Sequence, residues 1–295
     1  MSSAITFDHF HDIDAQAEQL LGFDQHYQQL DAGPYAGAFL TCQIGSVVVS
    51  VEWTNRTLYQ QGAGAHGVIS AVLLLREGRC RASRLNGDPL TTDHIVLLGE
   101  GTPFDATLEA GAVPVVVSIS ATEGCANALI KGRASCIVAP DLATRFRSLA
   151  KGAANGERSV VTEISSTNLM ALALSSPSER RRNIDIFREA SSALVGDQAT
   201  QQSVASVARS VGVSRRTLDK VFKANVGVTP GRFRKVSRLN RARRLIENGQ
   251  HSVTTAAGLS GLHHLGRFFQ DYNELFGELP SVALKRARRT RTTRD

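Results

Sequence analysis

Short apolar runs separated by turn-forming residues fill much of the first half of the chain. Between Ala38 and Ser120, runs rich in Val, Ile, Leu and Thr alternate with Gly, Asn, Asp and Pro. This spacing is typical of strands joined by turns. The clearest runs are 44–53, 67–75, 94–98 and 113–119, and the turn candidates are 86–89, 99–103 and 110–111. The pattern predicts an antiparallel sheet or a small barrel.

From Thr122 onward the apolar spacing becomes helical. Apolar residues recur on repeating faces at Cys125, Leu129, Ile130, Leu142, Phe146, Leu149, Ile164, Leu169, Leu172 and Leu174. We place a domain boundary near Ser176. The predicted fold class is α+β, with a mainly antiparallel β domain over residues 1–175 that ends in helices and an all-α domain over 176–295.

The C-terminal part contains one pattern twice. Four positions recur after 49 residues: Val204, Ala208, Gly212 and Val213 match Val253, Ala257, Gly261 and Leu262. After one extra residue the spacing becomes 50: Leu218, Phe222, Val226, Gly227 and Pro230 match Phe268, Tyr272, Phe276, Gly277 and Pro280. The same small unit is therefore encoded twice.

Each copy is predicted to form a helix, a tight turn and a second helix. In the first copy, over about 203–225, Gly212 can adopt the positive φ of a sharp turn and Ser214 can cap the next helix. The second copy spans about 253–275, with Gly261 at its turn and Leu265 in the apolar set of its second helix. Between the copies, an Arg-rich helix begins at Pro230 and ends near residue 248, with Arg243 on its surface.

The outward faces of the two second helices are the candidate functional surface. They carry Arg215, Arg216, Asp219, Lys220 and Lys223 in the first copy, and His263, His264, Arg267 and Gln270 in the second. Arg and Lys on such a helix can reach guanine edges and phosphates in the major groove. We therefore predict that these residues bind double-stranded DNA.

Charge is distributed unevenly along the chain. Residues 1–175 hold 11 Lys and Arg against 17 Asp and Glu, whereas residues 176–295 hold 23 against 10. A basic region of this density indicates a polyanionic partner for the C-terminal part. Charge alone does not distinguish nucleic acid from an anionic membrane surface.

Over Phe187 to about Arg286 the sequence resembles the AraC/XylS family of transcription regulators. The residues that carry the resemblance are Ala208, Gly212-Val213-Ser214, Leu218, Phe222, Gly227-Val228-Thr229-Pro230, Arg238-Leu239, Ala242-Arg243, His264-Leu265-Gly266-Arg267-Phe268 and Phe276-Gly277-Glu278-Leu279-Pro280-Ser281.

The resemblance implies seven helices, a linker helix and two recognition helices that enter successive major grooves. The positions that match the family's base-contacting ones are Arg216, Asp219, Lys220, His264, Arg267 and Gln270. It also implies a cupin-like N-terminal domain that binds an effector or mediates dimerisation. RNA polymerase, a small-molecule effector and a second copy of the chain are the expected partners besides DNA.

The sequence departs from the family pattern in the second copy. Leu262 and Ala256 stand where the family shows Phe and a larger aliphatic residue, so we expect looser packing there. Gly266 lies inside a recognition helix, which costs about 1 kcal/mol relative to Ala. The Arg-rich tail over 286–294 is expected to be disordered.

The N-terminal half offers weaker signals. The segment Gly22–Gly37 is similar to the N-terminal segments of some sensor domains of the family but identifies no ligand. His9 and His11 lack a third ligand at a suitable spacing, so we predict no metal. The segment 62–67 with His66 lacks the Lys and Ser/Thr of a phosphate loop and favours a hairpin. Tyr35, Phe39 and Trp53 are interpreted as core residues rather than pocket residues.

Several classes are disfavoured. Cys42, Cys80, Cys125 and Cys136 lack the spacing of zinc or redox pairs and are expected to be buried free thiols. No membrane span, secretory signal or cofactor motif is found, so a cytoplasmic location is expected. An enzyme in the N-terminal barrel would need a catalytic constellation, and no candidate has supporting spacing. A protein that coats nucleic acid without sequence preference stays an alternative.

Overall fold

The computed structural model describes residues 4–20, 23–45, 47–64, 66–80, 82–120, 134–138, 140–154, 182–195 and 202–292. The chain divides into two compact units. Unit 1 comprises residues 1–27 and 35–181, and unit 2 comprises residues 28–34 and 182–295. The segment 28–34, expected in the N-terminal domain, is thus grouped with the C-terminal helices. The boundary expected near Ser176 lies outside the described residues.

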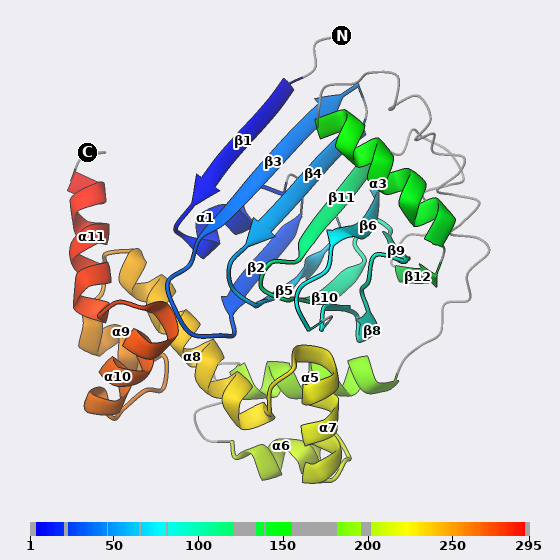
Figure 1. The fold of residues 1–295 in the computed structure, drawn as a ribbon. Helices are drawn as coiled ribbons and strands as arrows, with labels where there is room; N and C mark the ends of the chain where they lie inside the picture. Colours follow the sequence, from blue (N-terminus) through cyan, green and yellow to red (C-terminus); the bar gives the residue numbers. More distant parts are fainter. Residues whose placement is uncertain are drawn as a thin grey trace. The chain divides into compact units, whose positions relative to one another are not determined.

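Unit 1 is built on two sheets (Figure 1). The larger has the order β1 (Ala4–Phe10), β3 (Gly37–Ile44), β4 (Val47–Thr54), β11 (Val113–Ser120), β6 (Val68–Arg76), β9 (His94–Leu98) and β12 (Ala134–Val138). The smaller has the order β2 (Asp24–Gln29), β5 (Leu58–Ala63), β10 (Pro103–Leu108), β7 (Arg84–Leu85) and β8 (Asp88–Pro89). Neighbouring strands such as β3 and β4 pair antiparallel. The mainly antiparallel β prediction is confirmed.

The turn predicted at 86–89 is a tight hairpin between β7 and β8. Asn86 and Gly87 both have positive φ, at 52° and 83°. Two such residues in succession are what a two-residue type I′ turn requires, and Asn-Gly is its preferred sequence. The turn chemistry in the sequence therefore predicts this local structure correctly.

Apolar residues cover both faces of the larger sheet. On one face, Val72 and Leu98 pack with Phe104 and Leu108 of the smaller sheet. On the other, helix α3 (Pro140–Ala154) buries Ala143, Phe146 and Ala150 against the strands (Figure 1). Because β6 and β9 are apolar toward both sides, they appear in the sequence as continuous apolar runs rather than alternating ones.

The helical prediction after Thr122 can be compared with two described segments. Helix α3 agrees with the spacing of Leu142 and Phe146, but residues 134–138 form strand β12. The expected helical positions Cys125, Leu129 and Ile130 lie outside the described residues. Strand β12 pairs with β9 from Ala134 opposite Leu98 to Val138 opposite His94. A five-residue apolar segment does not reveal its period, so the helical prediction was wrong there. The expected helical positions from Ile164 to Leu174 lie outside the described residues.

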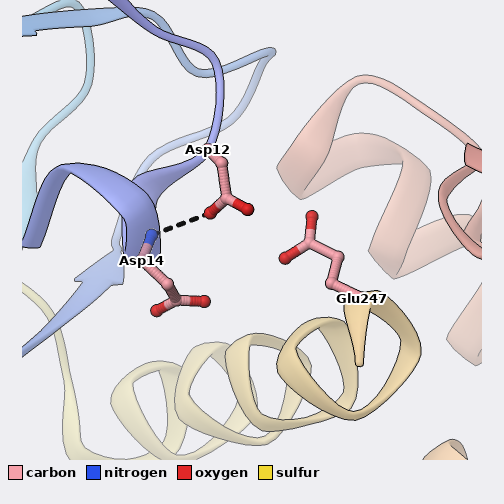
Figure 2. A group of neighbouring side chains, drawn as sticks. All are labelled: Asp12, Asp14 and Glu247. Carbon is pink, nitrogen blue, oxygen red and sulfur yellow. Dashed lines mark hydrogen bonds between the residues drawn. The ribbon is translucent and has the colours of Figure 1, made fainter. Parts of the chain in front are cut away.

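A short helix, α1 (Ile13–Ala17), follows strand β1. Asp12 caps it, because its Oδ1 atom accepts a hydrogen bond from the backbone N–H of Asp14 at 2.8 Å (Figure 2). The buried Gln16 side chain of this helix donates to the carboxylate of Glu52 at 2.9 Å. Helix α1 thus supports a buried polar group of β4.

Within its described residues, unit 2 contains seven helices (Figure 1). They are α5 (Arg182–Val195), α6 (Val204–Ser210), α7 (Arg215–Val226), α8 (Pro230–Glu247), α9 (Val253–Leu259), α10 (Leu265–Phe276) and α11 (Pro280–Thr292). This all-α architecture is as predicted. Among the described helices of both units, none has the length and apolar character needed to cross a membrane.

The Arg-rich tail is more ordered than expected. Helix α11 continues to Thr292, so the prediction of disorder from residue 286 was wrong. The Arg286 guanidinium donates to both carboxylate oxygens of Glu278, at 2.6 and 2.8 Å. The tail is helical because Pro280 begins a helix, as Pro230 does in the first copy.

Candidate DNA-binding surface

The first helix-turn-helix unit consists of α6 and α7. Ser203 and Ser214 cap the two helices by accepting hydrogen bonds from the amides of Ser206 and Thr217, at 3.0 and 3.1 Å. Gly212 has φ of 71°, which allows the chain to turn sharply between them. The predicted roles of Gly212 and Ser214 are therefore confirmed by the geometry.

The second unit, α9 and α10, repeats this geometry. Ser252 caps α9 through the amide of Thr255 at 3.1 Å, and Gly261 has φ of 70° at the turn. The amide after each turn glycine closes the same loop: Val213 donates to Ala208, and Leu262 to Ala257, both at 2.9 Å. Helix α10 differs from α7 because its N-cap, His264, makes no side-chain capping bond.

Aromatic side chains form the core of each helix-turn-helix unit. Phe222 of α7 meets Phe187 of α5 and Phe233 of α8 edge-on, with ring centroids 5.0 and 5.4 Å apart. In the second unit, Tyr272 packs edge-on between Phe268 and Phe276 at 5.6 and 4.7 Å. Phe222 and Tyr272 occupy matched positions of the repeat, and Phe268 and Phe276 match the buried Leu218 and Val226, so both helix-turn-helix units bury the same side of their second helix.

The candidate contact residues of α7 lie on the side away from this core. Arg215, Arg216, Lys220 and Lys223 are exposed, and Asp219 is half-buried. Ser214, which immediately precedes them, is also exposed. The first unit therefore offers a cationic helix face to a ligand outside the domain.

The second helix-turn-helix unit exposes histidine and glutamine side chains as well as arginine. His263 and His264 precede α10, whereas Arg267 and Gln270 lie on it, and all four are exposed. The Arg267 Nε atom lies 3.8 Å from a carboxylate oxygen of Asp271. Leu265, predicted to pack inward, is 37% exposed, so that assignment was wrong. Gly266 falls in the first turn of α10, where the backbone amide has no intrahelical partner in any case.

The linker helix α8 contacts both helix-turn-helix units through its basic side chains. Arg234 donates to the carbonyl of Gln202, just before α6, at 2.7 Å. Lys235 contacts Asp271 of α10 at 2.6 Å. The sequence predicted a solvated basic surface on α8 and missed these contacts, because a side chain's partner across the fold leaves no periodic signal.

Arg243 of α8 is buried, so the prediction that it lies on the surface was wrong. It is 5% exposed and lies over the ring of Phe276, 5.8 Å from the centroid. Glu247, drawn on α8 in Figure 2, pairs with it. Arg286 of α11 also lies 3.5 Å from Glu247. This cluster joins α8 to the ends of α10 and α11.

Comparisons with known proteins point to the same region. Residues 207–286 match a family model described as a helix-turn-helix domain. The chain is 40% identical over 86 residues to a probable thc operon regulatory protein of Rhodococcus erythropolis, covering 28% of this chain and 26% of that protein. It is 32% identical over 80 residues to a XylDLEGF operon transcriptional activator of Pseudomonas putida, covering 26% of this chain and 25% of that one.

Unit 2 contains a DNA-binding domain of the AraC/XylS family. A solved structure of a probable AraC family transcriptional regulator from Rhodopseudomonas palustris is 31% identical, covers 35% of this chain and 97% of its own, and has a TM-score of 0.32. The match spans about a quarter of the two curated relatives. The AraC/XylS assignment therefore concerns the repeated helices, and unit 1 must be interpreted from its own residues.

Unit 1 contains a cavity between its sheets. It measures about 510 Å³ including the space at its mouth, and its walls are mainly apolar, with Leu98, Phe104 and Val116 among them. Phe39, interpreted from sequence as a core residue, is buried and also lines this cavity. The cavity therefore offers an apolar environment inside unit 1.

A polar cluster interrupts the apolar wall. Glu52 is 7% exposed and accepts hydrogen bonds from Gln16 and Gln60 at 2.9 and 3.0 Å. Burial raises the pKa of Glu52, although these hydrogen bonds counteract part of the effect. Gln25 and Tyr27 of β2 line the cavity beside it. Among the described lining residues, none is basic.

Proposed function

We propose that this protein is a transcription regulator that binds a specific sequence of double-stranded DNA through α7 and α10. The supporting observation is the repetition itself. Two helix-turn-helix units with the same turn, and with a serine cap on the first helix of each, leave one face of the second helix exposed, and one linker helix joins them. Such a pair can occupy two successive major grooves, with the linker setting their separation.

A protein that coats nucleic acid without sequence preference is the second candidate, favoured by the basic charge of residues 176–295 alone. Gel-shift titrations at several salt concentrations separate the two, using random DNA and a duplex selected from a randomised library. Both candidates predict that log K falls with log salt, by about 0.9 per phosphate contacted. A regulator binds the selected duplex far more tightly, whereas equal affinities would support coating.

We further propose that the cavity of unit 1 binds a small-molecule effector that is uncharged or cationic. Its walls favour an apolar body, and the buried Glu52 carboxyl group, with no basic residue lining the cavity, disfavours an anion. The effector function makes the N-terminal unit a sensor rather than an enzyme.

Three probes of similar size test the charge preference: 2-phenylethanol, 2-phenylethylamine and phenylacetate. Binding is followed by the fluorescence of Trp53, the single tryptophan, which neighbours Glu52 on β4. We expect phenylacetate to bind most weakly. Tightest binding of phenylacetate would contradict the proposal.

The remaining partners are also proposals. A regulator of this type acts in the cytoplasm, contacts RNA polymerase at the promoter and works as a homodimer joined through unit 1. Helix α3 buries its apolar face against its own sheet, so the dimer contact must use another surface. Light scattering of the full chain should give a dimer, and a monomer would contradict this proposal.

A further inference from the structure

Residues 28–34 lie outside the helical sequence yet belong to unit 2, and they bind the linker helix α8 directly. The hydroxyl of Ser237 donates to the Gln28 side chain at 2.7 Å. Asn240 forms two bonds with the backbone of Gln29: its Oδ1 accepts from the amide and its Nδ2 donates to the carbonyl, both at 3.1 Å. A side chain of α8 thus pairs with Gln29 as a neighbouring strand would.

The same segment caps the C-terminal end of α10. The Leu275 carbonyl, in the last turn of that helix, accepts hydrogen bonds from the Gln29 side chain at 2.6 Å and from the Gly33 amide at 3.0 Å. Carbonyls in the last turn have no intrahelical donor, so an external donor stabilises the helix end. The Gln29 side chain also donates to the carbonyls of Asp31 and Gly33, which fixes the loop around it.

These contacts are buried and closely packed. Gln29, Asn240 and Leu275 are 1%, 0% and 2% exposed, so water cannot replace a lost bond. Pro34 lies so close to Gly277 that a Cβ atom there would be 2.8 Å from the proline ring. Residues 28–34 are therefore an integral part of the helical domain.

Residues 28–34 contact the second helix-turn-helix unit. The first helix-turn-helix unit packs against α5, whose Phe187 contacts both Phe222 and Phe233. In the second unit, the position that matches Asn225 of the first is Leu275, the residue that residues 28–34 bind. Residues 28–34 thus hold α10 against α8 as α5 holds α7.

We propose that residues 28–34 are a positioning strap that fixes α10 on α8 and so sets the geometry of the second recognition helix on DNA. The proposal rests on the proposed function of α7 and α10. The residues that precede the strap in strand β2, Gln25 and Tyr27, line the cavity of unit 1.

The test uses the full chain and two duplexes: the selected site, and the same site with the half bound by the second unit scrambled. Gln29→Met keeps the side-chain length but removes its donors, and Asn240→Leu removes both backbone contacts. We expect each variant to lose about tenfold of the preference for the intact site, while affinity for the scrambled site stays unchanged.

Asn225→Leu is the matched control, because Asn225 is a buried asparagine that donates to the carbonyl four residues earlier, as Asn240 does. It should leave the preference ratio at the wild-type value. Hydrogen exchange adds a second readout: in Gln29→Met, faster exchange should be confined to residues 265–277.

Two outcomes would overturn the strap: a wild-type preference in Gln29→Met, or an equal loss of affinity for both duplexes. Failure of the proposed function looks different, because the wild-type chain itself would then not distinguish the selected site from random DNA.

Discussion

We predict that sequence reading by the first helix-turn-helix unit depends most directly on Arg216 and Lys220. Both are exposed on α7, and the resemblance to the AraC/XylS family implies that they contact bases. Replacing either with Ala should weaken binding by about 1 to 3 kcal/mol and relax selectivity at one base position. Titration against a panel of single-base variants of the selected site measures both effects.

Arg209→Ala is the charge-matched control for these variants, since Arg209 is exposed on α6 rather than on the recognition helix. It should lower affinity evenly for all duplexes, if at all. An even loss in Arg216→Ala and Lys220→Ala would instead identify those side chains as phosphate contacts.

Glu52 should make the stability of unit 1 depend on pH. Burial raises the pKa of Glu52 above its ordinary value of 4.5, so between the two values the folded chain holds a proton that the unfolded chain has released. The free energy of unfolding must therefore fall as pH rises from 4.5 through this window. Denaturant titrations followed by Trp53 fluorescence measure it. Glu52→Gln should flatten this dependence, and an unchanged slope in the variant would refute the assignment.

Among the elements, the ends of α7 and α10 provide a matched comparison. Gly227 and Gly277 cap these helices with φ of 71° and 75°, so Ala at either position costs about 1 to 2 kcal/mol of backbone strain. Only at Gly277 would the added Cβ also meet Pro34. Thermal unfolding should show Gly277→Ala to be clearly less stable than Gly227→Ala. Equal losses would mean that Pro34 is not packed there.

The helix boundaries of unit 2 were predictable because their signals are local. Ser214, Gly212, Pro230 and Gly261 each act on the backbone within a few residues, and the structure places helix ends where they indicated. The exposure of Leu265 was not predictable in this way. Helical spacing gives an apolar face, but whether a neighbour covers its first turn depends on the rest of the domain.

Partners distant in sequence account for the other differences. Arg243 has the composition of a surface residue, and only the approach of Phe276 and Glu247 makes its burial favourable. Strands such as β1 are held by register with β3, which no local pattern encodes. The contacts of the strap at residues 28–34 are the hardest to predict from local patterns, since Gln29 and Asn240 are 211 residues apart.

Across the whole chain, the repeat is the feature that favours the proposed sequence-specific binding over non-specific binding. A single cationic helix binds phosphates anywhere along DNA, but two matched helices on one linker require two grooves at a fixed distance.

Hydroxyl-radical footprinting of the full chain on its selected site shows how many grooves of the duplex the protein occupies. Two recognition helices in successive major grooves should protect two patches on one face of the duplex, roughly one helical turn of 10 base pairs apart. Inserting five base pairs between the patches should abolish one of them. A single patch, or uniform protection along the duplex, would contradict the account.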